Sequence, residues 1–338
     1  MSLARRRVFN VAGPLSLLAI AAIGVGCGSE PNDGKVTVYS GREEEYIAPL
    51  MERYEKETGV EIEIKYGDSA ELAATIVEEG ENTPAEVFWA QDAGALGAVD
   101  DSGLFETLSS DTLSRVPARF RADDGNWVGT SGRARVVGYD SRELEESDLP
   151  ESILGFTDPE WKGRIGWAPT NGSFQAFVTA LRLVEGDETA RKWLEGIVAN
   201  EPQSFDDNEA IRDAIAAGEI DVGFLNHYYV AKAQAEDPDY PVSSYFPVDG
   251  DVGALVNVAG AGELIGGDAE AAEFISFLLS DESQRYFSRE LKEYPLVPGI
   301  ESEPELVPLS SIEQPDIDLS DLKDLNGTLD LLRETGAL

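Results

Sequence analysis

The chain alternates short runs of β-branched residues with stretches whose apolar positions recur at helical spacing. Residues 36–40 and 60–66 have the pattern of strands, and 43–57 place their apolar residues on one helical face. A further helix opens at Ser69, and a strand follows at 86–90. This βαβαβ series predicts an α/β fold, with a parallel sheet covered by helices on both faces.

A second segment repeats the same order of elements. Residues 164–167 and 219–225 predict strands, and 174–184 predict an apolar helix between them. Toward the C-terminus, the apolar spacing predicts one long helix over 271–287 and a closing helix over 319–334. The chain therefore holds two units of the same kind, each with strands that end in loops.

Ligands bind open parallel sheets at the carboxyl ends of the strands. Four polar loops follow predicted strands, at residues 40–43, 89–92, 170–173 and 226–229. A single site between two lobes would gather all four.

Composition removes several classes of function. The chain has 65 acidic against 26 basic residues and a formal net charge of −39, which argues against nucleic acid and against an anionic membrane surface as partners. One cysteine and one histidine exclude an internal disulfide, Cys/His zinc clusters and multi-histidine metal sites. A bound metal would need mainly oxygen ligands.

The N-terminus predicts an export signal rather than part of the fold. Residues 1–27 contain three consecutive arginines at 5–7 and then a short apolar run. The run ends at Cys27, in a sequence that resembles a prokaryotic lipobox and would make this residue a lipid anchor. A polar linker over 28–34 follows. Twin-arginine and general export both stay open.

Tyr228 and Tyr229 are the most distinctive pair. Two phenolates are hard anionic oxygen donors that suit a trivalent cation such as Fe³⁺, and binding must displace their protons. Ordinary packing is the alternative for such a pair. Glu43, at a predicted helix start, is either a dipole partner or a metal ligand, and the adjacent His227 is expected to be a supporting group.

The turn at Asn171, Gly172 and Ser173 precedes a helix and offers amide donors and a hydroxyl to an anion; simple helix capping is the alternative. Arg133 and Arg135 alternate on one face of an extended segment. They could hold a carboxylate, phosphate or carbonate, or could pair with the acidic surplus.

These residues stand in stretches that resemble the periplasmic ferric-ion-binding proteins of ABC importers, a branch of the type II solute-binding proteins. The similar stretches, in chain order, are VTVYSGR (36–42), YEKETGV (54–60), TPAEVF (83–88), SGRARVV (131–137), WKGRIG (161–166), NHYY (226–229), GALV (253–256) and EYPL (293–296).

The resemblance implies a two-lobed periplasmic-binding-protein type II fold with a central ligand cleft. Its implied lobe I comprises residues 35–132 and 259–308, and its implied lobe II comprises 133–258 and 309–338. It also implies a non-enzymatic, monomeric binding protein that works outside the cytoplasm with an importer permease and touches the membrane only through its lipid anchor.

The resemblance assigns Fe³⁺ to Tyr228 and Tyr229, with phosphate or carbonate as a synergistic anion at residues 171–173. Asn208 would lie beside that anion, and Arg135 would balance its charge. Relatives differ in the first lobe's ligand, so Glu43, Gln91 and Asp92 stay open for that position.

Two other interpretations remain at this stage. The same fold could bind another small solute, such as an organic cation or a phosphonate. A secreted hydrolase would use Glu43, Asp92 and Asp206 as candidate acids, although the chain has no Gly-x-Ser-x-Gly nucleophile motif.

Overall fold

The computed structural model describes residues 34–338. The expected signal at 1–27, the anchor at Cys27 and nearly all of the 28–34 linker lie outside the described residues. Within 34–338, none of the helices combines the length and the apolar character needed to cross a bilayer.

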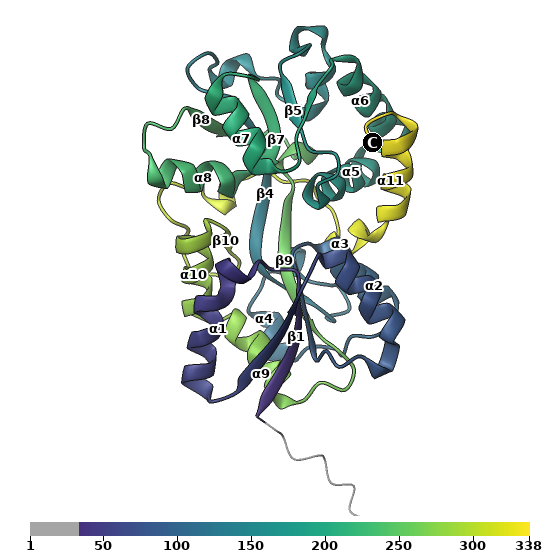
Figure 1. Ribbon diagram of the computed structural model, residues 1–338, viewed down its shortest axis with the longest axis vertical. Helices are drawn as coiled ribbons and strands as arrows, with labels where there is room; N and C mark the ends of the chain where they lie inside the picture. The colour runs from purple at the N-terminus through teal and green to yellow at the C-terminus, as the bar shows by residue number, and fades with distance from the viewer. Residues whose placement is uncertain (1–33) are drawn as a thin grey trace, which may run out of the picture. The chain divides into compact units, whose positions relative to one another are not determined.

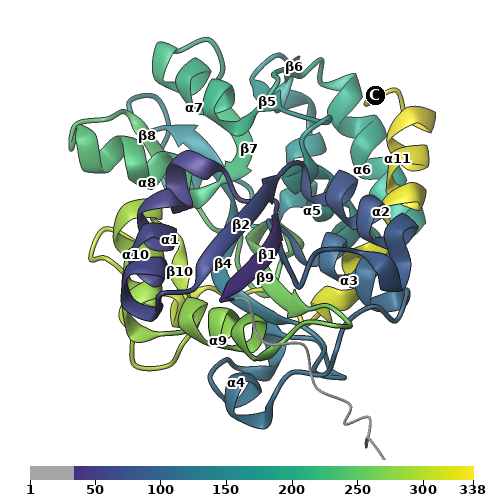
Figure 2. The same ribbon diagram turned by 60° about the horizontal axis from the view of Figure 1, so that its bottom comes forward.

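The strands of residues 34–338 join in a ten-stranded sheet that divides into two groups. The first group is joined in the order β2–β1–β3–β9, and it extends through the N-terminal half of β4 to β10. Its strands are β1 (Lys35–Ser40), β2 (Glu61–Tyr66), β3 (Val87–Ala90), β9 (Val256–Glu263) and β10 (Tyr294–Pro295). Its helices are α1 (Glu44–Thr58), α2 (Ser69–Glu79), α3 (Ala93–Asp101), α4 (Ser110–Ser114), α9 (Ala269–Leu278) and α10 (Asp281–Leu291). Helices α1 and α10 lie on one side of the β1–β2 pair, and α2 and α3 lie on the other (Figure 2).

The second group is built on the C-terminal half of β4. Its strands are β4 (Val128–Asp140), β5 (Ile165–Trp167), β6 (Gln203–Ser204), β7 (Val222–Asn226) and β8 (Val242–Tyr245). Its helices are α5 (Gly172–Glu185), α6 (Asp187–Ala199), α7 (Asn208–Ala217), α8 (His227–Glu236) and α11 (Leu325–Glu334).

Strands β4 and β9 run between the two groups (Figure 1). β4 changes partner midway: Ala134 pairs with Val256 of β9, whereas Arg135 pairs with Asn226 of β7. Both pairings are antiparallel, as is that of β3 with β9. The α/β prediction is confirmed, but the sheet is mixed rather than parallel because the strands that link the two groups run against their neighbours.

Aromatic side chains fill the core on both sides of this crossing. In the first group, Tyr54 lies edge-on to Phe274 with ring centroids 5.4 Å apart, and Trp89 packs on Phe274 and Phe287. The second group has its own set of buried rings: Phe156, Trp161, Phe174, Phe177, Trp193 and Phe224. Both sets belong to one continuous hydrophobic core, which runs through the two groups of strands.

Two sequence predictions near the C-terminus were wrong in detail. The expected helix over 271–287 is two helices, because α9 ends at Leu278 and Ser280 then caps α10 by accepting a hydrogen bond from the Ser283 amide. The expected helix over 319–334 is a 3₁₀ turn (Leu319–Lys323) followed by α11. The turn packs on α3, where a Cβ on Gly97 would lie 2.7 Å from the Ser320 carbonyl oxygen.

Candidate functional site

A polar cleft of about 170 Å³ lies where the two groups of strands meet. The residues around it come from the loops after β1 and β3, from β4, and from the start of α5, α7 and α8. Every residue that the sequence proposed for the iron and anion sites lines this one cleft: Glu43, Asn171, Gly172, Ser173, Asn208, Arg135, Tyr228 and Tyr229. Gln91 and Asp92 line it as well. The predicted convergence of the four strand-end loops is therefore confirmed.

The first-lobe wall depends on close contact between two loops. Gly41 follows β1, and a Cβ at this position would lie 2.0 Å from the Ser69 hydroxyl. The Ser69 hydroxyl in turn accepts a 2.9 Å hydrogen bond from the Gln91 amide. A residue larger than glycine at 41 would therefore displace the Ser69 hydroxyl from its contact with Gln91.

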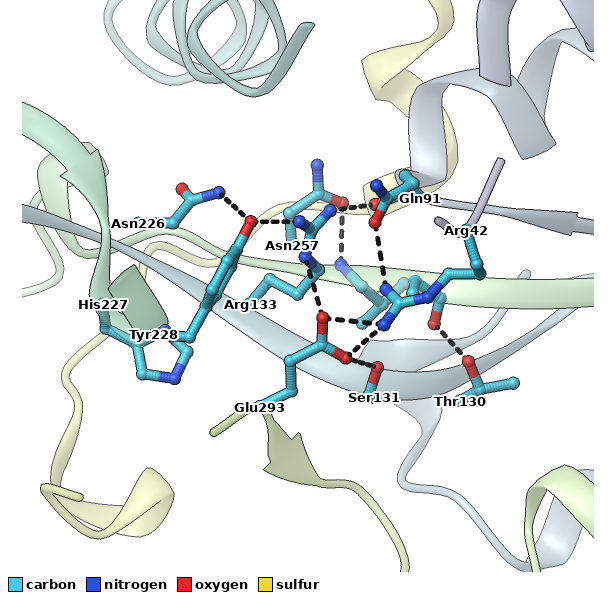
Figure 3. A network of polar contacts seen from close by, with 12 residues as sticks. Arg42, Gln91, Thr130, Ser131, Arg133, Asn226, His227, Tyr228, Asn257 and Glu293 are labelled. Carbon is cyan, nitrogen blue, oxygen red and sulfur yellow. Dashed lines mark hydrogen bonds and ion pairs between the residues drawn. The ribbon is translucent and has the colours of Figure 1, made fainter. Parts of the chain in front are cut away.

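Tyr228 and Tyr229 occupy the first turn of α8, with their ring centroids 4.4 Å apart and their planes tilted by 33°. The Tyr228 hydroxyl accepts hydrogen bonds from the Arg133 guanidinium and, at 3.4 Å, from the Asn226 amide (Figure 3). Burial, and then the adjacent Tyr228, raise the pKa of Tyr229. Tyr229 is thus protonated when the cleft is empty, and a cation must expel that proton to bind its oxygen.

A buried charge cluster holds Arg133 in place, and sequence reasoning missed most of it. The Glu293 carboxylate accepts two hydrogen bonds from Arg42, at 2.9 and 3.0 Å, and one of 2.6 Å from the Ser131 hydroxyl. Arg133 lies 3.4 Å from the same carboxylate and also donates to the Gln91 carbonyl at 2.8 Å. Figure 3 shows the chain of contacts from Arg42 to the Tyr228 hydroxyl. For Arg133, salt bridging rather than anion binding is therefore the arrangement found.

Arg135 lies two positions further along β4 and has no such partner. Its guanidinium donates to the Phe224 carbonyl at 2.7 Å and to the Ser173 hydroxyl at 3.3 Å, and its Nε is buried without a hydrogen-bond partner. No carboxylate of residues 34–338 forms an ion pair with it. Burial lowers its pKa to about 9, which leaves it charged at neutral pH. A buried cation without a counter-charge is a ready partner for an anion.

This guanidinium contacts the starts of α5 and α8, through Ser173 and Asn226, and the start of α7 is bonded to both. Asn171 caps α5 by accepting hydrogen bonds from the Ser173 amide at 3.1 Å and its hydroxyl at 2.6 Å. Asn208, at the start of α7, donates to the same Asn171 oxygen at 3.2 Å and accepts from the Asn226 amide at 3.1 Å. The capping alternative for Asn171 is thus correct, and it fixes the amides of Gly172 and Ser173 at the cleft. Helix starts of this kind favour an anion.

The three first-lobe candidates differ in how their side chains are used. Asp92 caps α3 by accepting a 2.9 Å hydrogen bond from the Ala95 amide, and Gln91 accepts one of 3.0 Å from Arg42. Glu43 precedes α1 but accepts no capping hydrogen bond, and it is exposed at the cleft. Of the two carboxylates among them, that of Glu43 is the one not used to cap a helix, so it can reach a cation.

The three acids considered for hydrolysis are not all at the cleft, since Glu43 and Asp92 line it but Asp206 does not. His227 stacks on Tyr294 with ring centroids 4.4 Å apart, and its Nδ1 accepts a 3.1 Å hydrogen bond from the Ala134 amide. Burial lowers its pKa to about 4. It therefore supports α8 as a neutral core residue, and residues 34–338 contain no group of three His, Cys, Asp or Glu side chains arranged for a metal.

The fold and the cleft define a type II solute-binding protein, and comparison with known proteins agrees. Residues 82–317 match the family of bacterial extracellular solute-binding proteins. The chain is 34% identical over 310 residues to the major ferric iron-binding protein of Neisseria meningitidis serogroup B, covering 89% of this chain and 92% of that one. It is 30% identical over 332 residues to the Fe(3+)-binding periplasmic protein of Serratia marcescens, covering 96% and 98%.

Solved structures give the same result. Iron-bound HitA from Pseudomonas aeruginosa matches with a TM-score of 0.83 at 31% identity, covering 89% of this chain and 99% of that one. A Trichodesmium protein in complex with iron and citrate ligands matches with a TM-score of 0.77 at 30% identity, covering 89% and 99%. This chain belongs to the bacterial extracellular solute-binding protein family. The resemblance drawn from the sequence is confirmed.

Proposed function

We propose that this protein captures ferric iron together with a synergistic anion outside the cytoplasm and delivers it to the permease of an ABC importer. The main support for the proposal is that one cleft combines candidate metal ligands with a candidate anion site. Tyr228 and Tyr229 supply paired phenol oxygens, and the buried Arg135 with the start of α5 supplies an anion site beside them. The names of the relatives in Neisseria and Serratia point to the same cargo.

The charges balance in this assignment. Two phenolates and the Glu43 carboxylate offset Fe³⁺, and Arg135 then offsets a phosphate, carbonate or carboxylate anion that completes the metal's ligands. Any metal that binds both phenolates must displace two protons. A divalent ion attracts the phenolates less strongly than a trivalent ion does, so the tyrosine pair favours a trivalent cation. Protons compete with the metal for both phenolates, and the affinity for iron therefore falls as the pH is lowered.

The proposed lobes, capture mechanism, oligomeric state and membrane anchor follow from the cleft and from the family. Ligand groups come from both sides of β4 and β9, so capture proceeds by closure of the two lobes. The lobes are proposed to comprise 35–132 with 259–308, and 133–258 with 309–338. A non-catalytic monomer, tethered through a lipid on Cys27 and exposing its cleft to the outside, completes the proposal.

The test is a visible spectrum of purified protein loaded with ferric citrate. A tyrosinate-to-iron charge-transfer band is expected, and Tyr229→Phe should shift or abolish it. Tyr240→Phe is the matched control, since the Tyr240 hydroxyl contacts the Asp213 carboxylate outside the cleft. A colourless wild-type protein, or an unchanged band in Tyr229→Phe, would contradict the proposal.

A melting experiment separates iron from other solutes. Ferric citrate should raise the melting temperature of the metal-free protein by more than a phosphonate, which can bind only the anion half of the cleft, whereas organic cations should leave it unchanged. Stabilisation by one of those solutes instead of iron would assign the cleft to another ligand.

A further inference from the structure

The two tyrosines of the cleft differ in their hydrogen-bond partners. The Tyr228 hydroxyl accepts from Arg133 and from Asn226, while no guanidinium or amide among residues 34–338 donates to the Tyr229 hydroxyl. The guanidinium of Arg133 also lies over the Tyr228 ring, 4.9 Å from its centroid. Two adjacent residues of one type therefore present unequal oxygens to the same ligand.

Arg133 is fixed independently of the tyrosine. Glu293 and the Gln91 carbonyl hold its guanidinium, and Glu293 is itself fixed by Arg42 and Ser131. The side chains of Arg42, Glu293 and Arg133 are only 3%, 4% and 11% exposed, so water competes little for these contacts. An arginine side chain stays protonated in proteins, so this fixed guanidinium presents a positive charge to the Tyr228 hydroxyl.

A hydrogen bond from a cation withdraws electron density from a phenolate oxygen. Groups that donate to a metal ligand orient it and tune how strongly it binds. Arg133 does both to Tyr228: its contact fixes the direction of the hydroxyl, and its charge weakens the donation of that oxygen to a metal. The charge of Arg133 also reaches Tyr229, but Arg133 donates no hydrogen bond to it, so Tyr229 remains the stronger ligand.

We infer that Arg133 is a positioning residue, held by Glu293 and Arg42, that makes Tyr228 the weaker of two unequal iron ligands. The inference rests on the proposed function, because it concerns iron held by these tyrosines. It separates Arg133 from Arg135: the first acts on the metal through a ligand, and the second binds the anion. A weaker Tyr228–iron bond is the contact most readily broken when the iron is handed on.

The test compares the charge-transfer bands of iron-loaded wild type, Arg133→Met and Arg53→Met. Removing the hydrogen bond raises the energy of the phenolate electrons, so the Arg133→Met band should move to longer wavelength. Glu293 keeps its two hydrogen bonds from Arg42 in this variant, so no buried carboxylate is left unpaired. Arg53→Met also removes one positive charge, but from an exposed pair with Glu282, and its band should not move.

Each outcome separates this inference from the proposed function. Wild type without a band overturns the function itself. A wild-type band that stays at the same wavelength in Arg133→Met overturns the inference alone. Loss of iron binding by folded Arg133→Met also overturns it, because Arg133 would then be needed to bind rather than to tune.

A second variant keeps the inference testable if Arg133→Met fails to fold. Arg133→Lys preserves the charge next to Glu293, but one ammonium cannot reproduce the fork that reaches both Glu293 and the tyrosine. Its band should also move to longer wavelength. An unmoved band in Arg133→Lys overturns the inference.

Discussion

Arg133 and Arg135 stand two residues apart on β4, face the same cleft and have opposite electrostatic surroundings. Arg133 belongs to a closed cluster in which Glu293 balances part of the charge and every neighbour is fixed. Arg135 has carbonyl and hydroxyl contacts only, with no carboxylate of residues 34–338 paired to it. The boundary between the two environments coincides with the change of partner of β4 from β9 to β7.

The difference shows which part of the cleft is complete before a ligand arrives. The Arg133 region is prepared in advance, and it contributes to the stability of the empty protein. The Arg135 region lacks a counter-charge, so an anion should stabilise it even when no metal is present. The two halves can therefore be tested separately, one through folding and the other through ligand binding.

The largest expected effect lies in the Arg133 region. Glu293→Gln leaves Arg42 and Arg133 buried without their carboxylate, and breaking a buried pair in this way costs about 3–5 kcal/mol. The free energy of unfolding of the metal-free protein, measured by urea denaturation, should fall by that amount. Arg53→Met, which breaks only an exposed pair, should lose about 0–1 kcal/mol. A loss in Glu293→Gln as small as in this control would show that the cluster does not stabilise the fold.

Sequence reasoning found the cleft because its signals are local. Tyr228 and Tyr229 are neighbours in the chain, and Asn171 caps the helix that begins at Gly172. Such features can be recognised in a few consecutive residues and then compared with a known family. The capping break at Ser280 was equally local, and its Ser-Asp-Glu signal at 280–282 could have divided the predicted long helix.

The Arg133 cluster could not be found in the same way. Glu293 lies 251 positions from Arg42 and 162 from Ser131, so only the folded chain brings them together. β4 was also hard to predict as a strand that joins two lobes, because nearly all of its residues are buried and only Arg133 and Arg135 mark an alternation in it. The environment that distinguishes Arg133 from Arg135 is therefore a product of topology.

A smaller effect is expected in the Arg135 region. Phosphate should raise the free energy of unfolding of the metal-free protein, by about 2.7 kcal/mol at a hundred times its Kd. In Arg135→Met this gain should disappear, since the buried counter-charge is gone. Arg191→Met is the control, because Arg191 is paired with Glu334 at an exposed site and should leave the gain intact. Equal stabilisation of wild type and Arg135→Met by phosphate would place the anion elsewhere.

The smallest expected effect is a change in iron affinity that distinguishes Glu43 from Asp92 as the first lobe's ligand. Glu43→Gln removes a side chain that caps nothing, so the unfolding of the metal-free protein should change by less than about 0.5 kcal/mol. Its affinity for ferric iron should nevertheless fall about tenfold, or about 1.4 kcal/mol, in competition with citrate. Asp92→Asn is the matched change, because asparagine caps a helix as well as aspartate does while removing the charge. If Asp92→Asn weakens iron binding and Glu43→Gln does not, then the cap of α3, rather than the free carboxylate before α1, is the first lobe's ligand. In that case the first lobe's metal ligand, like the Arg133 cluster, would be fixed before the metal binds. Only the Arg135 region would then depend on its ligand, which supplies the missing counter-charge.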